Sequence, residues 1–465
     1  MKKNRILSLL LCMCLLLGTL CPVCSAAEEL LEPIFDADFT VNAKAAMLID
    51  LNNGRVIYEQ NADEVVYPAS LTKIMTCLIA LERGNLSDMV TVSEGALENL
   101  GEDSSLAGLQ AGEQLRLEDL LYCMMIVSGN EACNVIAEHI AGNVGDFVRL
   151  MNERAYQLGC QNTHFANPHG LHNTGHYTTA RDLSIITQAA LKSENFRTIT
   201  NTTEYELPQT NLSEPRMLET TNLLINKSTS NKYYYPRASG IKTGYTGAAG
   251  RCVISTAKGD GLYLLGIVCG APTTVLDNGT LEFESFPECA KLFQYGFNNY
   301  KYVSILSPLY PVAQMTVTNS AASEVVALSP KEDVKLLMPI NYDPAELHTE
   351  NHLNGDSVEA PVHSGDVLGS VTVTYMGEFL EETDLVAIAD VARSEISAAA
   401  GGTGAFVQRN WWKWVIYLIL ALIALFVVMI IVRRIQRQKQ RRLRMQRRRQ
   451  ELERRFREEQ SDDWR

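Results

Sequence analysis

The chain has 465 residues, which is enough for two or three domains. It carries 41 basic and 54 acidic residues, for a formal net charge of −13. The imbalance is sharpest in residues 27–410, which hold 23 basic and 48 acidic residues, and so acidic a segment is a poor candidate for binding nucleic acid.

The N-terminal segment has the pattern of a secretory signal peptide. Three basic residues precede an apolar run at 6–20, and small residues lead to a cleavage position near Ala26. We therefore expect residues 1–26 to be removed and the chain that follows to lie outside the cytoplasm. An uncleaved membrane anchor is the alternative that the apolar run leaves open.

Seven cysteines follow the expected cleavage position. An odd number outside the cytoplasm argues against a complete disulfide framework. Most of them lie in apolar contexts such as CLIAL and GIVCG, in which cysteine behaves as a small hydrophobic residue. None has the spacing of metal ligands, so we expect neither a metal nor a cofactor.

Residues 41–299 have the pattern of an α/β (α+β) domain, preceded by a linker at 27–40. Two strands are predicted on either side of the Asn-Asn-Gly turn at 52–54, and two more on either side of a turn at 258–261. Apolar residues between these strand pairs recur at helical spacing, which predicts helices at 70–83, 117–126, 131–140, 146–158 and 180–192. Strands at both ends with helices between them favour an antiparallel sheet flanked by a helical cluster.

The pattern changes near residue 300 to short β-branched segments separated by turns, which predicts a small all-β domain at 300–392. A linker rich in small residues is expected at 393–410. Residues 411–432 have the pattern of a transmembrane helix, because 415–432 contain no charged residue and tryptophans flank them. A buried helix of a soluble domain is the alternative.

The C-terminal tail at 433–465 carries 14 basic and 6 acidic residues. Arginines directly after an apolar span place the tail in the cytoplasm, which agrees with the orientation that the signal peptide implies. We expect a single-pass protein of the cell membrane with its main domain outside the cytoplasm. The tail either lies along anionic lipid or stays solvated and only enforces the topology, and the sequence leaves both open.

The predicted helix at 70–83 begins with a serine and carries a lysine one turn later, in YPASLTKIMT. Ser70 and Lys73 share a helix face, so the hydroxyl and the amine can meet. A serine attacks a carbonyl only with a base beside it, and lysine is such a base when its pKa is lowered. The motif is weak alone, because Ser-x-x-Lys recurs at Ser255 and Lys258.

A second polar motif lies where two apolar helices meet, in IVSGNEA. Ser128 and Asn130 converge only if the backbone breaks between them, and Gly129 permits such a break. A plain helix–helix turn is an equally good interpretation of this motif alone, and Ser-x-Asn recurs at 193–195.

A third motif, Lys242-Thr243-Gly244, lies on an extended stretch before the second strand pair and occurs once. The glycine allows a substrate backbone to approach, the threonine offers a hydroxyl and the lysine supplies charge. The alternative is an edge strand with a solvated lysine.

The three motifs in this order mark the penicillin-recognising serine enzymes. The chain resembles the D-alanyl-D-alanine carboxypeptidases, the low-molecular-mass penicillin-binding proteins, over about 43–299 and in the β-domain that follows. The segments that carry the resemblance are YPASLTKIMT, SSLAGLQAGEQ, DLLYCMMIVSGNEA, LGCQNTHFANPHGL, YTTARDL and GIKTGYT. It implies the serine penicillin-recognising fold with an all-helical subdomain, and hydrolysis of the terminal D-Ala–D-Ala bond of peptidoglycan stem peptides.

The resemblance also implies roles for the catalytic groups. Ser70 is expected to be the nucleophile and Lys73 its base, with an acyl-enzyme on Ser70 that penicillins also form. Ser128 would pass a proton to the leaving amine. Lys242 would raise the local positive potential and help Lys73 stay neutral.

Substrate-binding roles are carried over in the same way. Asn130 would hold the substrate amide, Thr243 the terminal carboxylate, and the amides of Ser70 and Tyr245 would form the oxyanion hole beside Gly244. Three further residues match positions that line the family's substrate pocket, namely Ser105, His169 and Leu171.

Two departures from the family pattern affect substrate binding. Tyr245 stands where some members have histidine, and residues 270–285 contain no arginine, although many members have one in this loop. Recognition of the carboxylate is therefore expected to rest on Lys242 and Thr243.

Two alternative functions remain on the sequence alone. A β-lactamase of the same fold needs a glutamate-positioned water after the second motif, and residues 162–176 contain no glutamate. A noncatalytic wall-binding scaffold has no reason to keep all three motifs complete.

Overall fold

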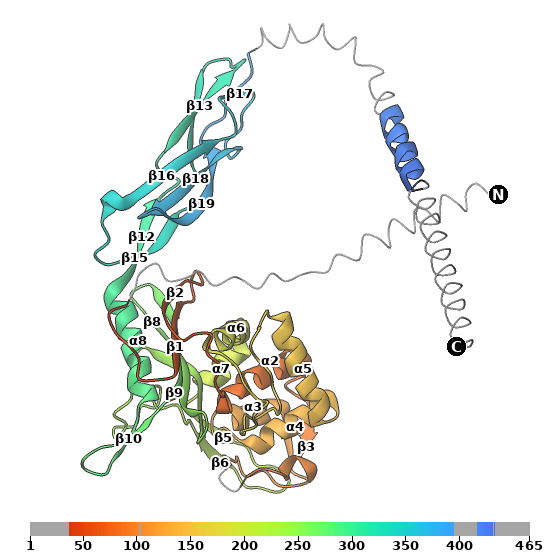
Figure 1. Cartoon of the computed structure of the whole chain (residues 1–465), viewed down its shortest axis with the longest axis vertical. Coiled ribbons are helices and arrows are strands. Elements are labelled where there is room, and N and C mark those ends of the chain that lie inside the picture. The colour runs from red at the N-terminus through yellow and green to blue at the C-terminus, as the bar shows by residue number, and fades with distance from the viewer. Residues whose placement is uncertain (1–36, 102–103, 395–415, 431, 433–465) are drawn as a thin grey trace, which may run out of the picture. The chain divides into compact units, whose positions relative to one another are not determined.

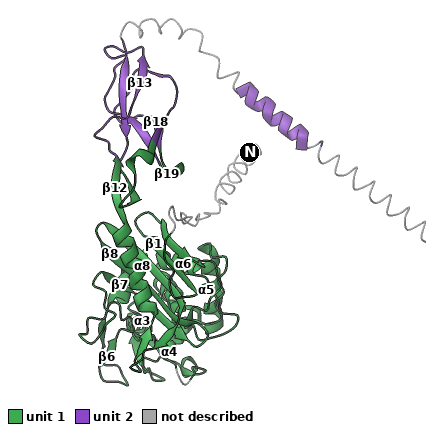
Figure 2. Ribbon diagram, turned by 60° about the vertical axis from the view of Figure 1, so that its left-hand side comes forward, with its two compact units in different colours: residues 1–305, 334–348, 373–381 green, residues 306–333, 349–372, 382–465 purple. Residues whose placement is uncertain are grey.

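A computed structural model describes residues 37–101, 104–394, 416–430 and 432 (Figure 1). The expected signal peptide, most of the linker at 393–410, part of the expected span and the basic tail lie outside the described residues. The chain forms two compact units, one of residues 1–305, 334–348 and 373–381, the other of the remaining residues (Figure 2).

The first unit is built on a five-stranded antiparallel sheet with the order β2-β1-β9-β8-β7. The strands are β1 (Ala45–Asp50), β2 (Val56–Gln60), β7 (Ala238–Thr246), β8 (Gly250–Gly259) and β9 (Leu262–Ala271). The two predicted strand pairs are thus joined through β1 and β9, and β7 lies at an edge of the sheet. One side of β7 is therefore not used by the ladder and can receive an extended peptide.

Both faces of this sheet are buried, because successive side chains of its strands enter two different cores. Met47 and Ile49 of β1 belong to the core under the helical cluster, whereas Ala46 and Leu48 pack toward α8 (Ser285–Asn299). Figure 1 shows α8 on one face of the sheet and the helical cluster on the other. The alternation of Cβ directions along a strand makes this two-sided burial possible.

The helical cluster consists of α2 (Lys73–Arg83), α3 (Leu117–Met125), α4 (Asn130–Ala141), α5 (Val144–Gln157), α6 (Ala180–Leu191) and α7 (Glu194–Asn201). The prediction contained no element at α7, although Ser193 caps this helix by accepting a hydrogen bond from the amide of Phe196. Paired two-stranded ladders complete the cluster: β3 (Met89–Thr91) with β4 (Gln114–Arg116), and β5 (Glu204–Leu207) with β6 (Arg216–Glu219).

The break between α3 and α4 differs in detail from the prediction. Ser128, not Gly129, takes the left-handed conformation, with φ of 65°, whereas φ of Gly129 is −55°. Gly129 is needed for space instead, because a Cβ there would lie 3.1 Å from Cβ of Ala107. The strained backbone conformation thus belongs to Ser128, a residue whose hydroxyl can take part in chemistry.

Residues 300–393 form mainly β structure: β12 (Tyr300–Leu306), β13 (Ala313–Thr318), β14 (Val325–Pro330), β15 (Val334–Pro339), β16 (Leu347–Leu353), β17 (Ser357–Glu359), β18 (Val367–Tyr375) and β19 (Glu378–Ala387). Six of these strands make a sheet with the order β16-β18-β19-β14-β13-β17, and β12 pairs with β15. A small all-β region was expected here, although residues 300–305 and 334–348 belong to the first compact unit.

Residues 416–430 are helical, and their apolar side chains are exposed. Within the described residues, no helix has both the length and the apolarity needed to cross a bilayer. The expected span at 411–432 extends beyond this helix into residues that the structure does not describe.

Candidate active site

Ser70 lies in a 3₁₀ turn (Ala69–Thr72) that leads directly into α2, so the predicted helix start is tighter than an α-helix. Ala69 has a positive φ of 48°, which is costly for a residue with a side chain. Two glycines make room around it. A Cβ on Gly170 would lie 1.8 Å from the carbonyl oxygen of Ala69, and one on Gly244 would lie 3.0 Å from the amide nitrogen of Ser70.

Lys73 is fully buried, and its amine has three partners. Nζ lies 2.9 Å from Oγ of Ser70, 2.6 Å from Oδ1 of Asn130 and 2.8 Å from the carbonyl oxygen of His169. The last two atoms can only accept hydrogen bonds. A neutral amine has two N–H groups for them and one lone pair, which is left facing the Ser70 hydroxyl. This geometry suits a base that takes the serine proton.

Burial lowers the pKa of both lysines of the site. Burial lowers the pKa of Lys73, against the smaller opposing effects of Cys133 and Glu131. Burial first, and then the charge of Lys73, lower the pKa of Lys242 well below its ordinary value. Protons on both amines together are therefore unfavourable.

The second motif contributes one direct contact to the Ser70–Lys73 pair. Asn130 begins α4, accepts from Lys73 and donates through Nδ2 to Oγ of Ser104 at 3.0 Å. Its backbone amide donates to the carbonyl oxygen of Ser105 at 2.9 Å. Ser128 is buried and its hydroxyl has no hydrogen-bond partner among the described residues, which leaves it free to act on a substrate.

The third motif lies at the exposed edge of the sheet, on β7. Lys242 is buried, whereas Thr243 is partly exposed and its hydroxyl lies 2.9 Å from the hydroxyl of Thr221. Tyr245 is exposed, and the guanidinium of Arg251 lies 4.0 Å from the centre of its ring. Residues 270–285 lack an arginine, but the neighbouring strand β8 thus places one beside the motif.

The three weaker candidates lie near the cluster through backbone groups. Ser105 and His169 each offer a carbonyl oxygen, to Asn130 and Lys73 respectively. The imidazole Nδ1 of His169 accepts instead from the amide of Leu171. Ser105 and Leu171 thus form hydrogen bonds only through their backbone groups within the described residues, which gives no support for a direct chemical role of their side chains.

Several polar residues of the site were absent from the prediction. Ser104 binds Asn130, and Thr221 binds Thr243. Glu131 is buried next to Asn130, and its Oε1 accepts from the amides of residues 107–109 at 2.6, 2.9 and 3.4 Å. Ser104 and Glu131 lie in segments that carry the family resemblance, SSLAGLQAGEQ and DLLYCMMIVSGNEA, but were not singled out there, and Thr221 had no local signal.

The second copies of the motifs have ordinary structural roles. Ser255 and Lys258 lie on the strand β8, where residues three apart point to opposite faces. The Ser255 hydroxyl donates to the carbonyl oxygen of Gly240, and Lys258 is exposed.

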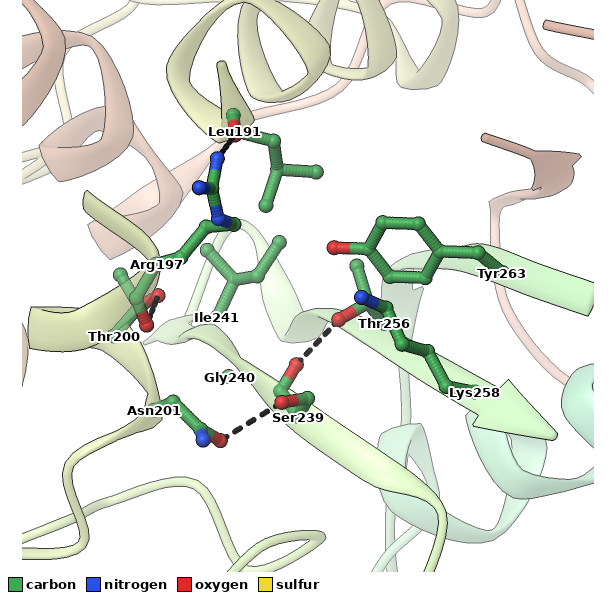
Figure 3. A pocket seen from close by; sticks show the side chains of 10 residues that line it. All are labelled: Leu191, Arg197, Thr200, Asn201, Ser239, Gly240, Ile241, Thr256, Lys258 and Tyr263. Carbon is green, nitrogen blue, oxygen red and sulfur yellow. Dashed lines mark hydrogen bonds between the residues drawn. The ribbon is translucent and has the colours of Figure 1, made fainter. Parts of the chain in front are cut away.

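A cavity of about 200 Å³ lies beside the start of β7, and it is separate from the site around Ser70 and Lys73. Figure 3 shows that Arg197, Lys258 and Tyr263 line it together with hydroxyl-bearing residues. None of its lining residues belongs to the predicted site, and the residues of β7 that reach it, 239–241, precede Lys242.

Comparison with known proteins gives matches over most of the chain. The family profile described as D-alanyl-D-alanine carboxypeptidase matches residues 32–273, and the profile of the C-terminal domain of penicillin-binding protein 5 matches residues 300–393. D-alanyl-D-alanine carboxypeptidase DacF of Bacillus subtilis is 33% identical over 76% of this chain and 86% of its own length. DacC of Escherichia coli is 30% identical over 84% of this chain and 93% of its own length.

A solved structure agrees with these matches. Penicillin-binding protein 5 from Haemophilus influenzae superposes with a TM-score of 0.59 at 28% identity, covering 77% of this chain and all of that one.

Proposed function

The chain belongs to the D-alanyl-D-alanine carboxypeptidase family, as a serine peptidase that binds penicillins, and we propose that it releases the terminal D-alanine of peptidoglycan stem peptides through an acyl-enzyme on Ser70. The observation that supports this nucleophile best is the 2.9 Å separation between Oγ of Ser70 and Nζ of Lys73. The two acceptors that hold Lys73 leave its lone pair for the serine proton.

Acylation begins when Lys73 takes the proton of Ser70 and Oγ attacks the carbonyl carbon of the penultimate D-alanine. Negative charge then develops on the carbonyl oxygen, where the amides of Ser70 and Tyr245 stabilise it. One such donor contributes about 3 kcal/mol in a serine protease. The C–N bond breaks as Ser128 gives its proton to the nitrogen and takes in turn the proton that Lys73 holds. D-alanine leaves, and Lys73 is neutral again.

Deacylation reverses the proton movements. Lys73 takes a proton from water, the hydroxide attacks the ester carbon, and Oγ of Ser70 leaves with the proton. The shortened peptide is released with a new carboxylate. Thr243 and the positive potential at Lys242 bind the terminal carboxylate of the substrate before the reaction.

Intact mass after incubation with a labelled penicillin tests the nucleophile. We expect one covalent adduct on the wild type, none on Ser70→Ala, and a full adduct on Ser255→Ala, which removes the serine of the second Ser-x-x-Lys. An adduct that persists in Ser70→Ala would place the nucleophile elsewhere. Rapid appearance of hydrolysed drug would favour a β-lactamase instead.

Release of D-alanine from defined pentapeptides tests the reaction itself. We expect stoichiometric D-alanine and tetrapeptide from the wild type, and neither from Ser70→Ala. A protein that forms the penicillin adduct but releases no D-alanine from any stem-peptide variant would contradict the carboxypeptidase assignment while leaving the nucleophile in place.

We propose that the protein is exported and held in the cell membrane by a single span at 411–432, with the basic tail in the cytoplasm. The apolar run, its tryptophans and the arginines that follow support this topology. Protease added to intact spheroplasts should degrade the catalytic unit and spare an epitope placed after residue 465. Degradation of that epitope would refute the orientation.

A further inference from the structure

The nucleophile turn is held from behind by a loop that is distant in sequence, residues 164–178. Its Pro168 carbonyl accepts from the hydroxyl of Thr76 at 2.6 Å, and its His169 carbonyl accepts from Lys73. Gly170 packs against the Ala69 carbonyl so closely that no side chain fits. The loop thus contacts Ala69 before the lysine, the lysine itself and Thr76 after it.

His176 closes this loop, and its tautomer follows from its partners. The ring is buried with an exposed fraction of 2%. Nδ1 accepts from the backbone amide of Ala166 at 3.1 Å, so it carries no proton. The proton of the neutral ring is therefore on Nε2, which lies 2.7 Å from the hydroxyl of Thr72 and donates to it.

Thr72 passes this contact on to the turn itself. Its hydroxyl accepts from His176 and donates its own proton to the carbonyl oxygen of Ala69 at 2.8 Å. Ala69 is the residue with the strained positive φ, and it directly precedes Ser70. A hydrogen bond to its carbonyl holds the peptide plane that joins Ala69 to Ser70.

We propose that His176 is a positioning residue for the nucleophile: through Thr72 it fixes the Ala69–Ser70 peptide, and with it the approach of the Ser70 hydroxyl to Lys73. The proposal rests on Ser70 as the nucleophile. Small misplacements of reacting groups have large effects on rate, because the productive geometry is narrow.

The two hydrogen bonds of the His176 ring, from Ala166 and to Thr72, require that the ring is neutral. It stays neutral under ordinary conditions. Burial first, and then the neighbouring His164, His172 and Lys73, lower the pKa of His176 to about 4. A protonated ring would lose the bond from Ala166, because Nδ1 would then also be a donor.

Two substitutions at this position separate positioning from simple loop stability. His176→Gln puts an amide N–H where Nε2 was and keeps the bond to Thr72. His176→Asn puts an acceptor where Nδ1 was and keeps only the bond from Ala166. Both lose one hydrogen bond of the ring, so a structural role predicts similar losses in both.

The measured quantities are the second-order rate of acylation by a labelled penicillin, kcat and KM for D-alanine release, and the unfolding midpoint. We expect His176→Asn to lower acylation and kcat about 10- to 100-fold with KM nearly unchanged, and His176→Gln to stay within about threefold of the wild type. Thr72→Val should lower the acylation rate and kcat as much as His176→Asn does. Thr72→Ser keeps the hydroxyl and should react at the wild-type rate.

The double variant Thr72→Val, His176→Asn should be no slower than the slower single variant, because both changes remove one chain of bonds. Equal rate losses in His176→Gln and His176→Asn that follow the unfolding midpoint would overturn the proposal, as would a normal rate in Thr72→Val. Either of these results would leave the penicillin adduct on Ser70 of the wild type, so the assignment of the nucleophile would stand. The lack of any adduct on the wild type would instead overturn both the nucleophile and the positioning role.

Discussion

At the scale of single residues, the directions of hydrogen bonds decide what the charged groups can do. Lys73 faces one group that can give it a proton and two that can only accept, so its chemistry is set by its acceptors as much as by its lowered pKa. Among the described residues, Nζ of Lys242 makes one hydrogen bond, to the carbonyl oxygen of Thr243 at 3.1 Å.

Replacing Lys242 by methionine tests the coupling of the two lysines. The variant removes the site that competes with Lys73 for a proton, so the pKa of Lys73 should rise. We expect acylation by penicillin to increase with pH in both proteins, because Lys73 must be neutral, with a higher midpoint in Lys242→Met. A pH–rate profile of kcat/KM measures this, and a midpoint shifted to lower pH would contradict the coupling.

The buried Glu131 is the second residue whose hydrogen bonds can be tested. Its Oε1 accepts from three successive amides, whereas its Oε2 has no partner among the described residues. Glu131→Gln weakens these charge-assisted bonds and should lower the free energy of unfolding by about 2 kcal/mol. Chemical denaturation measures the change.

Glu138→Gln is the matched control on the same helix, because Glu138 is partly exposed and accepts from one side-chain hydroxyl. We expect it to cost less than about 1 kcal/mol. A larger cost for Glu138→Gln than for Glu131→Gln would show that the Glu131 carboxylate does not hold residues 107–109.

At the scale of elements, the site lies where three structural breaks meet: the tight turn before α2, the left-handed residue before α4 and the exposed edge of β7. Each break is a place where backbone groups are not used by a regular ladder, so substrate groups can be received there. The helices and strands around them are regular and supply rigid support.

Gly170→Ala tests the closest approach between two of these segments. A Cβ would lie 1.8 Å from the Ala69 carbonyl, at a φ of 90°. We expect a loss of more than about 3 kcal/mol in the free energy of unfolding and a large loss of acylation.

The control for backbone strain alone is Gly142→Ala at the end of α4, where φ is 82° and no atom lies within 4 Å of the new Cβ. It should cost about 1 kcal/mol and leave acylation unchanged. A Gly170→Ala protein as stable and active as Gly142→Ala would show that the loop at 164–178 moves aside without consequence.

At the scale of the whole molecule, the first compact unit extends beyond the segment that the sequence predicted for it. Tyr300 and Leu337 belong to its core beside α8, and the hydroxyl of Tyr302 donates to the carboxylate of Asp50. The amide of Ile340 also donates to the carbonyl oxygen of Asn299 at 2.8 Å. The catalytic unit therefore depends on residues from the β region.

A chain ending at residue 299 tests this dependence. It would lose two buried side chains, Tyr300 and Leu337, each contributing about 2 kcal/mol of apolar burial. We expect a lower unfolding midpoint than in the full chain, and penicillin acylation that survives below that midpoint because the Ser70 cluster is intact. An unchanged midpoint would show that the unit is complete at 299.

Features with a local cause could be predicted from the sequence. The order and spacing of the three motifs, the helices at the motif-bearing segments and the four main strands follow from side-chain periodicity and turn residues. The sequence also pointed to Ser70 and Lys73 as a pair, because residues three apart meet on one turn of helix.

Contacts between distant segments became visible only in the folded chain. The acceptors of Lys73 come from residues 57 and 96 positions away, and His176 reaches Thr72 across 104 positions. No spacing rule links such residues, since the loops that carry them have no periodicity. The left-handed Ser128 was equally hidden, because serine has no preference for that conformation.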